Sequence, residues 1–288
     1  MNKDTNRLQI QNFYKKFLIF IEKYYVMSYI GRACFSGMTS EGYPFVSYVI
    51  SGRSAGSQKR RFKLYFDLNT GEDRVNVGSL GEPTEDQKKR ADLIFYNCMR
   101  TRNGTIFVTN GAQTDVNVFE NRPARNFYSG FGAATAEEIL GDWGYEPDVP
   151  LFTPRIALVK GEGRDALFAI AARQSDDDDR TYTGQITVPV NGSEATGIAT
   201  YKGLHESEAQ PWRGVDLEHL NLCLVRFPIR GVDPEEIRDS TYKAIDPRYV
   251  VAAAAAVYDG RKWVFAEPKN KWDSLEEFEA GEAKKWPV

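Results

Sequence analysis

Histidine and cysteine are scarce in this chain of 288 residues. The two histidines are His205 and His219, and the three cysteines are Cys34, Cys98 and Cys223. The cysteines show neither metal-site nor disulfide spacing, and so few potential ligands argue against a zinc site. We therefore expect no metal and a reducing, cytoplasmic location.

An excess of positive charge is also absent. Lysine and arginine total 37 against 40 aspartate and glutamate residues, which gives a formal net charge of -3. Because duplex nucleic acid requires a basic protein face, we expect no nucleic-acid partner.

The N-terminal region lacks an apolar run long enough to cross a membrane. Residues 17–21 are apolar, but charged residues bracket them closely on both sides. Such a run is too short for a spanning helix or a signal-peptide core, so we expect no membrane partner. The apolar spacing instead predicts an amphipathic helix within an extension of residues 1–28. The apolar residues on one face of this helix are Ile10, Phe13, Phe17, Phe20 or Ile21, and Tyr24. We expect the helix to dock on the main domain or on a second subunit.

A phosphate-binding glycine loop of the Walker type is missing as well. Residues 161–163 form only a lone Gly-Glu-Gly turn pattern. This argues against a nucleotide triphosphatase and against a dinucleotide-dependent dehydrogenase. The acidic residues 175–179 lack the ligand spacing of an EF-hand and predict a solvated loop.

Strand-like segments dominate what the chain does contain. Runs of β-branched and aromatic residues predict strands at 43–51, 62–66, 93–96, 105–109, 156–159, 166–172, 182–190, 222–227 and 262–266. Helices are predicted at 120–140 and at 233–244, the second with Asp233 as its N-cap, and Asp259-Gly260 predicts a hairpin turn after the small apolar residues 250–258. Strands in runs, with helices grouped, predict an α+β fold of layers with one main domain at 29–288.

Five short polar clusters lie at the ends of these strand-like runs. They are residues 29–32 (YIGR), 53–54 followed by 60–61, 96–100 (YNCMR), 110–115 (NGAQTD) and 153–155 (TPR). Four of the five contain arginine, whose guanidinium binds phosphate and carboxylate groups in a bidentate manner. The pattern predicts a pocket for a small phosphorylated molecule.

Taken in order, these motifs resemble the archaeal-type IMP cyclohydrolase family. The matching stretches are YIGR at 29–32, GRS at 52–54, YNCMR at 96–100, TNGAQTD at 109–115, YEPD at 145–148, TPRI at 153–156 and AAAAAVYDG at 252–260, while 165–240 matches poorly. The resemblance implies a four-layer α-β-β-α sandwich of two mainly antiparallel sheets, like that of N-terminal-nucleophile (Ntn) hydrolases. It also implies closure of the purine six-membered ring, from a formamido-imidazole-carboxamide ribotide to IMP and water, without cofactor or metal, in a homo-oligomer.

Two residues correspond to catalytic positions of that family. Glu146 would move a proton, and Arg60 would polarise the formyl oxygen or orient the carboxamide, although Arg61 is an alternative for the second role. Without the resemblance, Glu146 is interpreted as a surface carboxylate in a proline-bounded loop. Arg60 is then interpreted as a solvated charge in the run Lys59-Arg60-Arg61.

The remaining candidates are expected to bind substrate. Arg32, Arg53 and Ser54 are candidates for the phosphate or ribose, with a packing salt bridge at a sheet edge as the alternative for Arg32. Arg155 is a second phosphate candidate, and Asn97 would read the carboxamide or cap a turn. In the cluster at 110–115, the backbone of Asn110 and Gly111 would face an anion, and Thr114 and Asp115 would contact ligand or cap the next helix.

Two other functions stay open at this point. An amide-bond hydrolase of the same fold would need a Cys, Ser or Thr made N-terminal by cleavage, and Cys34 is more simply a small buried hydrophobe. A ribonucleotide-binding module without catalysis would bind IMP but would not convert the formamido precursor.

Overall fold

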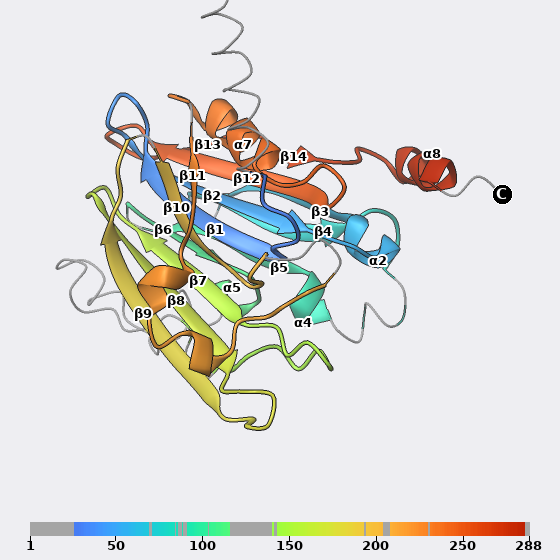
Figure 1. The fold of residues 1–288 in the computed structure, drawn as a ribbon. Coiled ribbons are helices and arrows are strands. Elements are labelled where there is room, and N and C mark those ends of the chain that lie inside the picture. Colours follow the sequence, from blue (N-terminus) through green and yellow to red (C-terminus); the bar gives the residue numbers. More distant parts are fainter. Residues whose placement is uncertain are drawn as a thin grey trace, which may run out of the picture.

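Two seven-stranded sheets form the body of the protein, and the computed structural model describes residues 26–285 apart from 69–70, 84, 86–87, 89–90, 103, 116–139, 141–142, 193, 204–207 and 230 (Figure 1). The first sheet has the order β11-β10-β1-β2-β12-β13, with β14 also paired to β12. Its strands are β1 (Arg32–Met38), β2 (Pro44–Ser51), β10 (Glu194–Ala199), β11 (Val225–Pro228), β12 (Val250–Tyr258), β13 (Trp263–Phe265) and β14 (Lys269–Asn270).

The second sheet runs in chain order from β3 to β9. Its strands are β3 (Arg60–Asp67), β4 (Glu72–Ser79), β5 (Tyr96–Arg102), β6 (Thr105–Thr109), β7 (Arg155–Lys160), β8 (Asp165–Arg173) and β9 (Thr181–Pro189). The pairings between these named strands are antiparallel in both sheets. The prediction of an α+β fold with two mainly antiparallel sheets is therefore confirmed.

The main core lies between the two sheets. Because alternate residues of a strand face opposite sides, one face of each sheet contributes its apolar residues to this layer. Tyr48 of β2, Phe62 of β3 and Tyr96 of β5 all belong to one buried cluster there. Cys34 of β1 lies in the same cluster with no exposed surface, and burial raises the pKa of its thiol.

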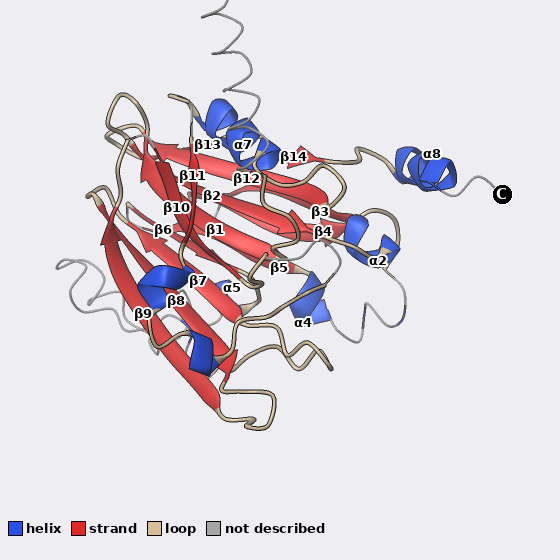
Figure 2. Cartoon of the chain, in the orientation of Figure 1, coloured by secondary structure: helices blue, strands red, loops and turns tan. Residues whose placement is uncertain are grey.

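The outer face of the first sheet is covered by α7 (Pro234–Lys243), as Figures 1 and 2 show. Ile237 of α7 packs with Phe227 of β11 and with Ala253 and Ala255 of β12 in a second buried cluster. The alanines of β12 let the helix approach the sheet closely. Asp233 caps α7 by accepting a hydrogen bond from Glu236 N at 2.8 Å, so the helix expected at 233–244 is confirmed.

The outer face of the second sheet carries a third apolar cluster. Phe107, Leu167 and their neighbours pack there with the fully buried Leu140. Most of the helix expected at 120–140 lies outside the described residues, as does the expected N-terminal helix up to residue 25. The remaining short helices are α2 (Ala55–Gln58), α4 (Ala91–Ile94), α5 (Gln113–Asp115), η3 (Gly214–Asp216) and η4 (Leu220–Cys223), with α8 (Leu275–Lys285) near the C-terminus.

Two predicted strands are wrong in part. The segment 93–96 contains the end of α4 before β5 begins, and the segment 222–227 contains the end of η4 before β11. Short apolar runs do not distinguish a strand from a helical turn, which is why the pattern failed at both places. The hairpin at Asp259-Gly260 is confirmed, since it joins the antiparallel strands β12 and β13.

The polar clusters gather where the strands of each sheet begin or end, at one end of the sheet. Neighbouring antiparallel strands run in opposite directions, so the start of one strand lies beside the end of the next. Arg32 at the start of β1 pairs with Ile50 of β2, and Tyr96 at the start of β5 pairs with Val77 of β4. Clusters 29–32 and 153–155 thus precede their strands instead of ending them, and 96–100 lies inside β5.

Arg32 does not lie on an edge strand. Its strand β1 pairs with β2 on one side and with β10 on the other. The expectation of a sheet-edge position for this residue is therefore wrong. Among the described helices, none has the length and apolar character to cross a membrane.

Replacing Ile237 with Ala should lower the free energy of unfolding by about 2–5 kcal/mol, because the side chain is fully buried against the first sheet. Urea unfolding followed by circular dichroism measures this change. Glu235→Gln, at an exposed position of the same helix, is the control and should cost at most about 1 kcal/mol. Equal effects of the two substitutions would contradict the packing described for α7.

Candidate active site

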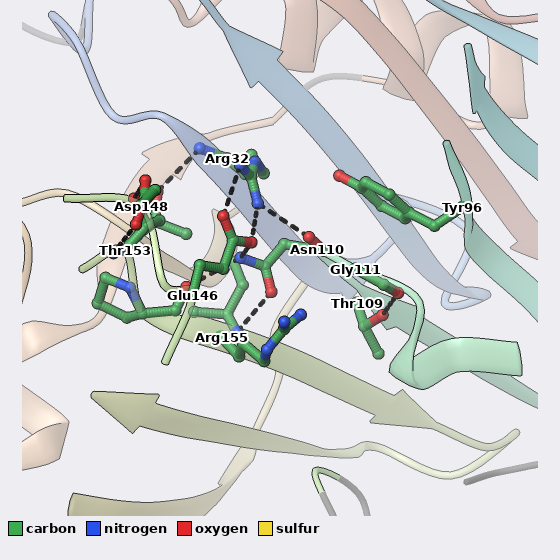
Figure 3. Close-up of polar contacts among 12 residues, drawn as sticks. Arg32, Tyr96, Thr109, Asn110, Gly111, Glu146, Asp148, Thr153 and Arg155 are labelled. Carbon is green, nitrogen blue, oxygen red and sulfur yellow. Dashed lines mark hydrogen bonds and ion pairs between the residues drawn. The ribbon is translucent and has the colours of Figure 1, made fainter. Parts of the chain in front are cut away.

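A buried ion pair joins the two sheets at the strand ends where the polar clusters gather. Arg32 Nη2 donates to Glu146 Oε2 at 3.0 Å, and Arg32 Nη1 contacts Glu146 Oε1 as well (Figure 3). Arg32 Nη1 also donates to the Asn110 backbone oxygen at 2.9 Å. Only 1% of Glu146 is exposed, so the interpretation of this residue as a surface carboxylate is wrong.

The surroundings of Arg32 favour the charged form of its guanidinium. Burial alone would lower the pKa of Arg32, but Glu146 and, more weakly, Tyr96 and Tyr48 raise that pKa well above its ordinary value. The guanidinium is therefore a permanent cation in a water-poor place, where charge interactions are strong.

Asn110 fastens the loop that carries Glu146. Its Nδ2 donates to Pro154 O at 2.9 Å, and its Oδ1 accepts from Ile156 N at 2.8 Å at the start of β7. The same Nδ2 lies 3.5 Å from Glu146 Oε1. The side chain of Asn110, and not only its backbone, is thus part of the site.

Two buried tyrosines face the ion pair from the inter-sheet core. The hydroxyls of Tyr48 and Tyr96 lie 3.0 Å apart. Burial raises the pKa of both phenols, while the Arg32 guanidinium acts in the opposite direction on each. Both therefore keep their protons in the neutral pH range and can donate a hydrogen bond.

Arg60, and not Arg61, faces this site. Arg60 shares a strand face with Phe62, which belongs to the core between the sheets, whereas Arg61 points to the other side and donates to Asp273 O at 3.4 Å. Burial lowers the pKa of Arg60, Arg32 lowers it further, and Tyr96 and Glu146 oppose the shift. No residue in the described part of the chain accepts a hydrogen bond from this half-buried guanidinium, so its donors are available to a ligand.

Arg53 and Ser54 lie at the exposed rim, just after β2. The Arg53 guanidinium carbon lies 4.6 Å from the centre of the Tyr29 ring, and Tyr29 packs against Tyr201 and Tyr249 at 5.4 and 5.7 Å between ring centres. Ser54 caps α2, where its hydroxyl accepts from Ser57 N at 3.2 Å. The structure therefore places Ser54 in a helix cap and Arg53 beside an aromatic group.

Asn97 lies on the outer face of the second sheet, and Arg155 points away from the inter-sheet core at the start of β7. Asn97 pairs with Asn76, whose side-chain amide donates to Asn97 Oδ1 at 3.4 Å, whereas Tyr96 faces the core. Arg155 donates to Gln113 Oε1 at 2.9 Å and lies over the ring of Trp143 at 4.6 Å. Asn97 is therefore separated from Arg32 by the thickness of the sheet, whereas Arg155 lies behind the Asn110 loop, since Gln113 Nε2 also donates to Asn110 Oδ1 at 3.3 Å.

The loop after β6 is a compact turn. Thr114 is fully buried and its hydroxyl donates to Gly111 O at 3.2 Å, while the side chain of Asp115 lies outside the described residues. A Cβ on Gly111 would lie 2.4 Å from an Arg155 nitrogen, so a side chain here would displace the ends of Arg155 and Gln113. Thr114 thus closes the turn.

Sequence reasoning missed three contributors to the site. The strand that contains Tyr48 was predicted, but the direction of the Tyr48 side chain into the core was not. Asp148 and Tyr201 meet at Thr153, and Tyr201 comes from the stretch with the poorest family match. The YEPD motif was the one available signal for Asp148. Among the described residues, no three His, Cys, Asp or Glu side chains are placed to hold a metal ion.

The fold and the site together define a class of protein. It is an α+β sandwich in which the strand ends of two sheets enclose a buried ion pair, a second arginine and two phenols. A family model for IMP cyclohydrolase-like proteins matches residues 29–262, and the chain belongs to that family.

Named relatives agree with this membership. The IMP cyclohydrolase of Methanococcus aeolicus is 29% identical over 235 residues, which cover 81% of this chain and 96% of that protein. The IMP cyclohydrolase of Methanocaldococcus jannaschii is 28% identical over 235 residues, 80% of this chain and 94% of that protein. A Methanococcus maripaludis IMP cyclohydrolase is 34% identical over a shorter stretch of 134 residues, 46% of this chain and 57% of that protein.

Replacing Arg32 with Met should lower the free energy of unfolding by about 3–5 kcal/mol, because it leaves the Glu146 carboxylate buried without its partner. The double variant Arg32→Met/Glu146→Met should recover much of that loss, since no charge is then stranded. Urea unfolding measures both. Arg180→Met, which breaks an exposed ion pair with Asp178, is the control and should leave stability close to wild type. A double variant no more stable than Arg32→Met would show that the pair is not coupled as described.

Proposed function

We propose that this chain is an IMP cyclohydrolase that closes 5-formamido-1-(5-phosphoribosyl)imidazole-4-carboxamide to IMP with loss of water. The observation that carries the proposal is the buried Arg32–Glu146 pair facing Arg60 and Tyr96. It lies where the motifs of an IMP cyclohydrolase-like family converge. The names of the relatives support the same activity.

The reaction requires little help in bringing its partners together. The carboxamide nitrogen and the formyl carbon already belong to one molecule, so few torsions have to be frozen. The difficulty is that an amide nitrogen is a poor nucleophile and a formamide carbonyl is a poor electrophile. The enzyme must therefore supply proton transfer and a donor for the developing oxyanion.

The site has groups suited to both tasks. Arg60 donates to the formyl oxygen as the carboxamide nitrogen attacks the formyl carbon and a C–N bond forms. Glu146, held by Arg32, takes a proton from that nitrogen and gives it to the formyl oxygen, which becomes a hydroxyl. Glu146 then moves the proton of the former formamide nitrogen to this hydroxyl, so that a C=N bond forms, the C–O bond breaks and water leaves. The Tyr96 phenol, protonated because burial raises its pKa, is a second donor to the oxyanion.

Charge balance favours an anionic ligand. Two guanidiniums, Arg32 and Arg60, face one carboxylate, Glu146, while both tyrosines are neutral. An anion or an oxyanion would offset the remaining positive charge. Arg53 at the rim, beside Tyr29, is our candidate for the ribotide phosphate. The proposal also includes the substrate contacts expected for five further residues, which are Ser54, Asn97, Thr114, Asp115 and Arg155.

A cytoplasmic location and a homo-oligomeric state complete the proposal. All three cysteines are free and buried, which suits a reducing compartment. The rival amide-bond hydrolase would need Cys34 as an N-terminal nucleophile, but this thiol lies inside β1 with a raised pKa.

Adding the formamido precursor to the purified protein should produce the purine chromophore, followed by ultraviolet absorbance. Glu146→Gln should lower kcat by about 10²–10⁴-fold, the range of general acid–base catalysis, because the amide cannot accept the proton. A protein that binds IMP but never converts the precursor would instead be a binding module, and the proposed activity would be rejected.

Arg60→Ala should lower turnover by at least about 100-fold, since one oxyanion donor contributes about 3 kcal/mol. Arg61→Ala is the matched control: it removes the same charge from the neighbouring residue, whose side chain points away from the site. The same absorbance assay compares the two, and its rate should stay near wild type for the control. Equal losses, or a near-normal rate for Arg60→Ala, would remove Arg60 from the mechanism.

A further inference from the structure

Asp148 closes the loop from which Glu146 extends. Its Oδ1 accepts a hydrogen bond from Thr153 N and its Oδ2 accepts one from Thr153 Oγ1, both at 2.6 Å (Figure 3). Glu146 N donates to Thr153 O at 2.8 Å and closes the same loop a second time. Asp148 therefore holds the backbone that carries the Glu146 side chain.

The Thr153 hydroxyl connects this loop to Tyr201. Because that hydroxyl donates to Asp148, it accepts from the Tyr201 hydroxyl, which lies 3.0 Å away. Burial, together with Tyr29, raises the pKa of Tyr201 to about 12, so the phenol keeps the proton that it donates. The direction of both hydrogen bonds is thereby fixed.

Tyr201 in turn contacts the segment that carries Arg32. Its backbone N donates to Ile30 O at 3.2 Å, and the preceding Thr200 hydroxyl accepts from Arg32 N at 3.1 Å. The Tyr201 ring fills the space beside Gly31, where a Cβ would lie 2.6 Å from it. Hydrogen bonds and packing thus connect the Glu146 loop to the start of β1.

Building on the proposed cyclohydrolase activity, we propose that Asp148 is a positioning residue which, through Thr153 and Tyr201, holds the Glu146 carboxylate against the Arg32 guanidinium. Its own carboxylate is committed to Thr153, so it acts on the reaction through Glu146. A misplacement of about 1 Å in a catalytic group can cost on the order of 100-fold in rate. Asp148 does not touch the reacting groups, but through these contacts it affects the rate of the reaction.

Asp148→Asn tests this inference. Asparagine keeps one acceptor for Thr153 N but turns an N–H donor toward the Thr153 hydroxyl, so that hydroxyl loses the acceptor that fixes its direction. We expect kcat to fall about 10- to 100-fold, with a change in KM of less than about 3-fold. The acidic limb of the rate profile should move to higher pH, because a carboxylate that loses part of its cation contact takes up a proton more readily.

Tyr201→Phe removes only the last donor of the chain. It should shift kcat and the pH profile in the same direction by a smaller factor. The loss in the double variant should be smaller than the product of the two single losses, as expected for residues in one network.

Asp233→Asn is the matched control. Asp233 also accepts a backbone hydrogen bond, from Glu236 N at 2.8 Å, but it caps α7 on the outer face of the first sheet. Its rate per folded molecule should equal that of wild type. The inference is overturned if Asp148→Asn keeps the wild-type kcat and pH profile, or if its loss only follows the folded fraction measured by circular dichroism.

Failure of the proposed activity would be seen separately, as a wild-type protein that does not convert the precursor. Crystal structures of wild type and Asp148→Asn then decide the positioning role. Separation of the Glu146 carboxylate from Arg32 in the variant would support it, and retention of both contacts of the pair would reject it.

Discussion

The ion pair between Arg32 and Glu146 is the contact on which the site depends. Removing two charges from water is costly, and their attraction compensates only when the geometry is good and the remaining donors and acceptors are satisfied. Here the compensation comes from several directions. Asn110 supplies its backbone oxygen to the arginine, and its side-chain amide lies beside the carboxylate. The pair is therefore stable only while the loop after β6 and the loop before β7 keep their shapes.

Antiparallel topology explains how residues so distant in sequence meet. The start of each strand lies next to the end of its neighbour, so loops from many parts of the chain meet at the same strand ends of a sheet. Packing of the two sheets places these strand ends side by side, because Tyr48 and Tyr96 meet across the core and Arg32 contacts a loop of the second sheet. Glycine is required at Gly31, which has a φ of 71° and lies against the Tyr201 ring.

Much of the fold was predictable because nearly continuous apolar runs, buried on both faces of the sheet, mark β2, β6, β7 and β8. The strands that were missed have a different composition. β1 and β10 contain Gly37 and Gly197, and a Cβ on Gly197 would lie 2.2 Å from the Phe35 ring, so tight packing replaces the usual β-branched side chains. β4 is largely polar on its outer face, with Arg74 and Asn76 there, and gave no apolar signal. The sequence pattern detects apolar side chains and not the small residues that admit them.

The site was predictable to a lesser extent, for a reason of strand geometry. The motifs identified Arg32, Asn110 and Glu146, which the structure brings together. They could not show that Asn97 faces away, because a single residue of register decides which side of a sheet a side chain occupies. The contribution of Tyr201 could not be predicted for another reason. Its contact with Thr153 joins residues that are 48 positions apart in the chain.

Strand register also decides between the two neighbouring arginines of β3. Arg60 follows the inward parity of Phe62, and Arg61 follows the outward parity of Lys63. A second cation in this place is unfavourable by itself, since burial and, to a smaller extent, the charge of Arg32 lower the pKa of Arg60. The repulsion is only partly offset by Glu146, whose carboxylate is already engaged by Arg32. A site that keeps such a cation half-buried gains free energy when an oxyanion approaches it, and in a reaction that develops negative charge this gain is largest at the transition state.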